Sequence, residues 1–262
     1  MNYGKHSNSK SFRGGGQSSL STITGIGAGS GPFRAAEKRT IKSGFTLAEV
    51  LITLGIIGVV AAMTLPSITA SKQREELKAS LKKNYSIIQQ VFLHLASDNG
   101  GSLRPADIGG WTLKKDMMKY MKVLKDCGYG TLEADACVSN MYNNPELSST
   151  KYKTFDGRLI SSLTYFDDGQ FILSDGSFYM LENNKGSIYI TVDVNGINKN
   201  PNQWGYDLFT FQLTDKGKLL PMGAEGTDYT DDTYCSKSST DKYNGIACAN
   251  KAISDKDYWK NL

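Results

Sequence analysis

The chain has 262 residues, of which 39% are hydrophobic and 21% charged, and this balance excludes a disordered polar chain. The net charge of +4 is unevenly distributed: the first 44 residues hold seven basic side chains and one acidic one, so the rest of the chain is net −2. A mildly acidic body provides no electrostatic argument for nucleic-acid binding, so the sequence predicts no nucleic-acid partner.

Residues 1–44 combine basic side chains with glycine and serine, a composition typical of a linker. The glycines do not form a phosphate-binding loop, because no Gly-Lys-Ser/Thr follows them and no strand precedes them. The next methionine is Met63, so a shorter leader would require a non-standard start.

Residues 45–68 form an apolar run with one charged side chain, Glu49. A helix of this length would span about 36 Å, enough to cross a hydrocarbon layer about 30 Å thick. Lys38, Arg39 and Lys42 precede the run. The excess of positive charge on cytoplasmic segments therefore places the N-terminus in the cytoplasm and the remainder outside.

Glu49 argues against the two simpler interpretations of this run. A secretory signal peptide has an apolar core of about 7–15 residues, whereas this run is longer and contains an acid. A plain membrane anchor leaves unexplained a carboxylate that is costly to place in lipid. No Lys, Arg or His lies between Phe45 and Ser71 to neutralise it.

Cleavage between Gly44 and Phe45 would supply a partner for Glu49. The cut creates an α-amino group four residues before Glu49, and this amine can neutralise the carboxylate of its own chain or of a neighbour. Pairing between neighbouring chains would set the axial register of a helical polymer.

The junction resembles that of the type IV filament family, which comprises type IV pilins and the pseudopilins of type II secretion. It reads Lys-Ser-Gly over residues 42–44 and Phe-Thr-Leu-Ala-Glu over residues 45–49. The resemblance implies cleavage after Gly44 by a prepilin peptidase, N-methylation of Phe45 by the same enzyme, and Glu49 as the assembly carboxylate. These expectations make residues 1–44 a leader that is removed.

The resemblance continues through Gly55 and Gly58 to Pro66. The two glycines lie on nearly one helix face and let helices approach closely, although ordinary transmembrane glycine is the alternative. Pro66 removes a backbone hydrogen bond, so we expect it to kink or locally melt the helix.

The family implies the partners and the location. The partners are like subunits and other pilins, the prepilin peptidase and methylase, and an inner-membrane assembly platform. The chain would span the inner membrane once, with a cytoplasmic N-terminus and an exported head, before entering an extracytoplasmic filament.

Beyond Pro66 the spacing of apolar residues predicts an amphipathic helix, which the Asn-Gly-Gly at residues 99–101 ends. A single helix is therefore expected over residues 45–99, with its membrane part over 45–68. The expected buried stripe is Leu77, Leu81, Ile88, Phe92 and Leu95.

Residues 100–262 are expected to form the head. A second short helix is predicted over residues 111–124, and β-rich runs separated by turn sequences follow. An antiparallel meander packed on the long helix gives an α+β, type IV pilin-like fold. The tail, residues 223–262, is predicted to form loops. The expected strands are residues 163–166, 170–173, 178–181, 188–192 and 208–213.

Four cysteines, Cys127, Cys137, Cys235 and Cys248, favour disulfides in an exported head. A four-cysteine zinc site is the competing interpretation, but the intervals do not resemble the short knuckles of such sites. Three pairings are open, and short-loop closure favours Cys127–Cys137 with Cys235–Cys248.

One stretch of the head is a candidate metal site. Asp193 and Asn195 stand two residues apart before a glycine, and Asp207 is the third candidate ligand, as in calcium loops. Some pseudopilins bind calcium in their C-terminal loops. An Asp-x-Asn-Gly turn bonded to its own backbone is the favoured alternative, so no cofactor is predicted and calcium is the one candidate.

The sequence favours a structural subunit of an extracytoplasmic helical filament, either a type IV pilus or a type II secretion pseudopilus. The alternative is a minor pilin that acts as a tip adhesin or ligand-binding module. No enzyme is predicted, because the chain has two histidines and no HExxH, GxSxG or histidine-based triad pattern.

Overall fold

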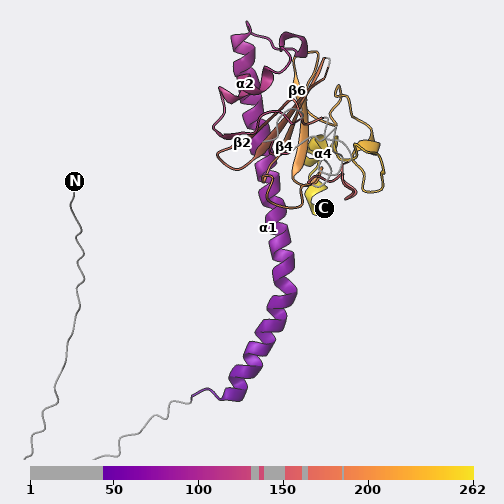
Figure 1. The fold of residues 1–262 in the computed structure, drawn as a ribbon. Helices are drawn as coiled ribbons and strands as arrows, with labels where there is room; N and C mark the ends of the chain where they lie inside the picture. The colour runs from indigo at the N-terminus through magenta and orange to yellow at the C-terminus, as the bar shows by residue number, and fades with distance from the viewer. Residues whose placement is uncertain (1–43, 131–135, 139–150, 161–164, 185) are drawn as a thin grey trace, which may run out of the picture. The chain divides into compact units, whose positions relative to one another are not determined.

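The computed structural model describes residues 44–130, 136–138, 151–160, 165–184 and 186–262. Its contacts divide the chain into two units, one up to Ile52 and one from Thr53 onward, and each is considered by itself. The architecture is α+β, with a long apolar N-terminal helix and one antiparallel sheet, which confirms the predicted fold class (Figure 1).

Helix α1 (Leu47–Asp98) contains 52 residues and continues through Pro66. Pro66 therefore does not melt the helix, because the turns on both sides propagate across the one missing backbone donor, and the other expectation, a kink at Pro66, stays a prediction. All five residues of the expected stripe are buried, together with Asn84 and Val91. Gly100 and Gly101 then adopt positive φ angles, a conformation that glycine adopts at little cost and that ends the helix.

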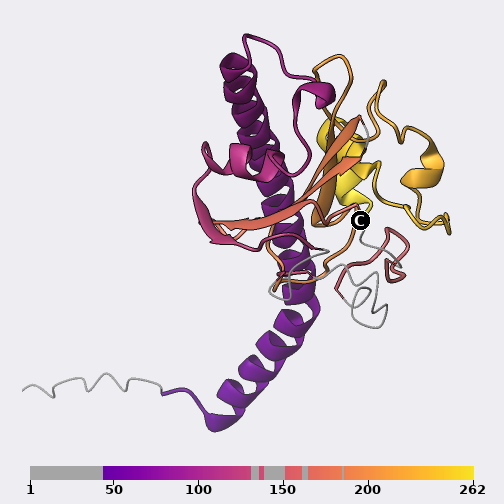
Figure 2. The same cartoon turned by 45° about the horizontal axis from the view of Figure 1, so that its top comes forward.

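The sheet is a six-stranded antiparallel meander in the order β1-β2-β3-β4-β5-β6. Its tight connection at Gly186 pairs Asn184 with Ser187. Figure 2 shows the strands lying beside α1. The strands are β1 (Val123–Asp126), β2 (Gly169–Leu173), β3 (Phe178–Asn184), β4 (Ser187–Asp193), β5 (Leu208–Leu213) and β6 (Leu219–Pro221).

Both faces of the central strands are buried. On one face, alternate residues such as Tyr179, Ile190 and Phe211 join the core formed with α1. On the other face, Met180 and Leu208 pack into a second apolar cluster. The sheet is therefore a middle layer, which explains why nearly every residue of β4 and β5 is buried, including those with polar side chains.

A buried polar contact also joins α1 to the sheet. The Tyr179 hydroxyl donates to Asn84 Oδ1 at 2.7 Å, and both residues are fully buried. Tyr85 stacks on Phe211 with ring centroids 5.0 Å apart. Because a buried amide is costly unless it is bonded, this contact favours one registration of the helix on the strands.

Two element predictions are wrong. Helix α2 (Leu113–Met118) is shorter than residues 111–124, because the chain enters β1 at Val123 and pairs with β2. A strand was expected at residues 163–166. Tyr165 and Phe166 lie in a turn instead, and residues 163–164 lie outside the described part of the chain.

The tail is more ordered than expected. It forms helix α4 (Cys248–Ser254), and three short 3₁₀ segments occur in the head at Pro105–Asp107 (η1), Asp232–Tyr234 (η2) and Tyr258–Lys260 (η3). Trp259 is buried against Phe209 of β5, so the C-terminus contributes to the core. The disulfides join Cys127 to Cys137 and Cys235 to Cys248, as the short-loop argument predicts.

Candidate functional site

The segment at residues 44–49 contains the cleavage and assembly residues expected from the sequence. Gly44 and Phe45 precede the first turn of α1, and Phe45 is 90% exposed. The Thr46 backbone N–H and hydroxyl both donate to Glu49 Oε2 at 2.8 Å, and the Glu49 N–H donates to Thr46 Oγ1 at 3.2 Å.

This reciprocal pattern is a capping box, in which the residue before the helix and the third helical residue bond each other's backbone. The sequence analysis missed it, although Thr-x-x-Glu before an apolar run is its signal. Glu49 therefore has a local role within its own chain, since it satisfies a backbone donor that the first helical turn leaves open.

The apolar part of α1 is exposed along its length. The most hydrophobic window of the helix has a mean hydropathy of 2.2 and is 0% buried, and the helix is long enough to cross a membrane. A continuous exposed apolar surface of this extent is unfavourable in water and requires lipid or other proteins around it.

Gly55 and Gly58 leave room on this surface. A Cβ placed at either position would meet no atom within 4 Å. Their lack of side chains is thus not required by packing within the described chain, which is consistent with close approach of another helix. Pro66 lies within the same exposed helix.

In the head, Asp193 lies at the end of β4 and is fully buried. Its Oδ1 accepts from the N–H of Asn195 at 3.3 Å and of Gly196 at 2.8 Å, and its Oδ2 accepts from the Tyr152 hydroxyl at 2.9 Å. These bonds close a turn directly after the strand.

Asp207 is the second buried carboxylate of this loop. It accepts from the N–H of Asn202 at 2.8 Å and of Gln203 at 2.6 Å. Its own carbonyl accepts from the N–H of Val194 at 2.8 Å. Asp207 therefore ties the long β4–β5 connection to the end of β4.

The geometry favours the turn interpretation over calcium at this loop. Every carboxylate oxygen of Asp193 and Asp207 already accepts at least one N–H or O–H, and these donors would have to turn away to admit a cation. Only Asn195 Oδ1 is buried without a hydrogen-bond partner among the three residues. Calcium at Asp193, Asn195 and Asp207 stays a prediction.

Burial changes the titration of both acids. It raises the pKa of Asp193 to about 7, with Asp207 adding repulsion, and it raises the pKa of Asp207 to about 6. The ordinary value is 3.8. Between the ordinary and the raised values, the folded chain binds more protons than the unfolded chain, so the free energy of unfolding falls as pH rises.

We therefore expect the full-length protein, unfolded by urea in detergent with EDTA present, to lose stability between about pH 5 and pH 7. Asp193→Asn should reduce the loss of unfolding free energy across this interval by more than about 1.4 kcal/mol, the equivalent of one pKa unit. Glu182, whose pKa burial raises to about 9, adds a loss of the same sign that Asp193→Asn leaves in place. Carboxyls with a lowered pKa, such as Asp228, are ionised in both states in this window and add no slope. Stability that rises over the same interval would contradict the expectation.

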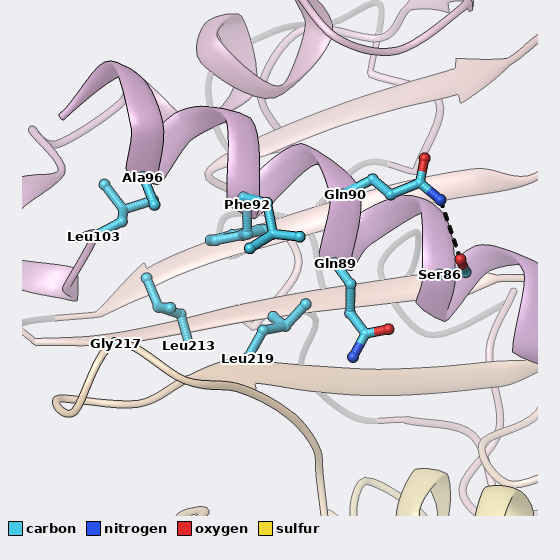
Figure 3. Close-up of a pocket in the computed structure, with 10 residues that line it drawn as sticks. Ser86, Gln89, Gln90, Phe92, Ala96, Leu103, Leu213, Gly217 and Leu219 are labelled. Atoms are coloured by element: carbon cyan, nitrogen blue, oxygen red, sulfur yellow. Dashed lines mark hydrogen bonds between the residues drawn. The ribbon is translucent and has the colours of Figure 1, made fainter. Parts of the chain in front are cut away.

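The head also carries a groove between the second half of α1 and strands β5 and β6 (Figure 3). Its volume is about 380 Å³. Phe92, Leu213 and Leu219 line its apolar part, and Gln89 and Gln90 provide amides. No titratable side chain lines it among the described residues, so the groove suits recognition of an apolar group.

Comparison with known families identifies the N-terminal segment. Residues 39–65 match the family model described as the prokaryotic N-terminal methylation motif. The match covers Gly44, Phe45 and Glu49 together with both helix glycines. No curated protein and no solved structure matched the chain. The chain therefore carries the prepilin-type signature of type IV pilins and pseudopilins, joined to an α+β layout that is consistent with a pilin-like fold.

Proposed function

We propose that this protein is a structural subunit of an extracytoplasmic helical filament, either a type IV pilus or a type II secretion pseudopilus. The observation that carries the proposal is the methylation motif at residues 39–65 on a helix whose apolar surface is fully exposed. The motif itself points to a structural family whose members are generally not enzymes.

The proposed mechanism begins with processing. The basic segment before Gly44 stays in the cytoplasm, α1 enters the membrane, and the head is exported. A prepilin peptidase then removes residues 1–44 and methylates the new amine of Phe45. The positive charge created there is the counter-charge that the membrane segment otherwise lacks among residues 45–71.

Assembly then follows from two surfaces of the same helix. The Glu49 carboxylate pairs with the amine of a neighbouring subunit, which favours one axial offset between chains. The exposed apolar side chains, with Gly55 and Gly58, pack against other subunits when these leave the lipid. The heads form the outer layer, held on α1 by the buried stripe from Leu77 to Leu95.

A second candidate is a minor pilin that binds a ligand at the filament tip. The groove at Phe92, Leu213 and Leu219 favours it, because an apolar, uncharged hollow on the head is not needed for packing of the membrane segment. Counting copies per filament separates the two roles: many copies support the structural subunit, and a few at one end support the tip role.

The structural proposal is tested at the N-terminus. We expect mass spectrometry of the protein purified from membranes to find a chain that begins at Phe45 and carries one methyl group. Gly44→Leu should block processing because it places a bulky side chain at the cut, whereas Gly31→Leu, a matched change within the leader, should not. A mature chain that begins at another residue would overturn the proposal.

A further inference from the structure

Three carboxylates lie together at one end of the sheet, away from the N-terminal motif. Asp167 and Asp168 immediately precede β2, and Glu182 lies in the adjacent strand β3. The pairing of Gly169 with Leu181, and the bond from the Asp168 N–H to the Leu181 carbonyl at 2.9 Å, bring them side by side. One oxygen from each of the three lies within 4.8 Å of the others.

This cluster is buried, and one of its oxygens is unsatisfied. Glu182 and Asp167 are each 8% exposed. Glu182 Oε2 is buried and has no hydrogen-bond partner in the described part of the chain. Asp168 accepts from the N–H of Asn183 at 2.8 Å. An orphaned carboxylate oxygen at this depth is costly and requires an explanation.

Among the residues that the structure describes, no lysine or arginine forms a salt bridge that would neutralise Asp168 or Glu182. Burial, followed by repulsion from Asp168 and Asp167, raises the pKa of Glu182 to about 9. Three neighbouring carboxylates with a buried, unpartnered oxygen form an arrangement that a bound positive ion would neutralise.

We infer that Asp167, Asp168 and Glu182 bind one divalent cation, with Ca²⁺ as the best match. All donors are carboxylate oxygens, which hard cations prefer. Two ligands of one Ca²⁺ lie at most about 5 Å apart, twice the Ca–O distance, and the three oxygens, which lie within 4.8 Å of one another, satisfy this limit. Mg²⁺ keeps several of its waters and demands near-octahedral geometry at about 2.1 Å, so three carboxylates fixed on neighbouring strands suit it less well than Ca²⁺.

The cation would bridge two neighbouring strands. Glu182 belongs to β3, while the two aspartates immediately precede β2, so one ion would tie the entry of one strand to the next strand. Cation binding by the head would hold whether or not the chain polymerises. The affinity expected for an extracellular calcium module is about 0.1–1 mM.

The test is calcium titration of the full-length protein in detergent after removal of metals with EDTA. Calorimetry should detect one Ca²⁺ per chain, and CaCl₂ should raise the thermal unfolding midpoint, whereas MgCl₂ at equal concentration should have a smaller effect. Glu182→Gln and Asp168→Asn should each raise the calcium dissociation constant at least tenfold. Asp215→Asn, which removes an exposed acid from the turn between β5 and β6, is the matched control and should leave it unchanged.

Thermal unfolding in EDTA shows whether a cluster variant still folds when no calcium is present. Glu182→Gln replaces an acid whose ionisation burial and the two aspartates disfavour by a neutral amide of the same shape. In EDTA the variant should therefore unfold at the same temperature as the wild type or higher, and it should unfold below the wild type only when calcium is added. Absence of calcium binding by the wild-type protein would overturn the inference. So would binding that survives both cluster variants, or binding that Asp193→Asn abolishes, which would place the ion in the β4–β5 loop instead.

Discussion

A Glu49→Ala chain is expected to be inserted and processed normally but to form no filaments. The substitution removes the one charge from the membrane segment, so insertion into lipid becomes more favourable. It also removes the carboxylate that would pair with the amine of a neighbouring subunit. The measurement compares membrane-bound protein with protein in sheared filaments, and mass spectrometry checks that the chain still begins at Phe45.

The capping box supplies a sharper variant of this experiment. Glu49→Gln removes the charge but keeps an oxygen that can accept from the Thr46 N–H, as glutamine does in capping boxes. If charge pairing directs assembly, Glu49→Gln fails to assemble as completely as Glu49→Ala. Filaments from Glu49→Gln alone would show that the cap is what matters, and normal filaments from Glu49→Ala would exclude Glu49 from assembly altogether.

Leu81→Ala is expected to destabilise the head by about 2–5 kcal/mol, the usual range for a buried leucine cut to alanine. Leu81 is fully buried in the core that α1 forms with the sheet. Leu93→Ala makes the same chemical change in the same helix, but Leu93 is 71% exposed, so it should cost less than about 0.5 kcal/mol. Urea unfolding of both full-length variants in detergent measures the difference.

This comparison tests whether α1 is the spine of the head. A small effect at Leu81 would mean that the sheet folds without the helix. Equal losses at both positions would mean that helix propensity, and not burial, sets the cost, since the two variants share the same residue types in the same helix.

Local patterns in the sequence predicted the long elements well. Helix α1 was predicted because its apolar residues recur at helical spacing and Asn-Gly-Gly ends it, and both signals act within a few residues. Four of the predicted strands correspond to β2, β3, β4 and β5 for a similar reason, since turn residues separate short β-rich runs.

The misses came from segments whose structure depends on distant partners. Val123 and Leu124 were assigned to a helix, yet they form β1 because β2, more than forty residues later, offers an open edge. The tail was assigned to loops, yet Trp259 finds a buried position against β5. In both cases the partner strand lies far away along the chain, whereas periodicity reports only on residues that are close in sequence.

The candidate sites divide in the same way. By itself the sequence determined the methylation motif and the long apolar helix, and it predicted the cut after Gly44 and the role of Glu49, because contiguous residues define all of these features. Only the tertiary structure decided that the acids of the β4–β5 loop are held by backbone donors and that Asp167, Asp168 and Glu182 lie within 4.8 Å of one another. Glu182 is separated from the two aspartates along the chain, and only the pairing of β2 with β3 brings their charges together.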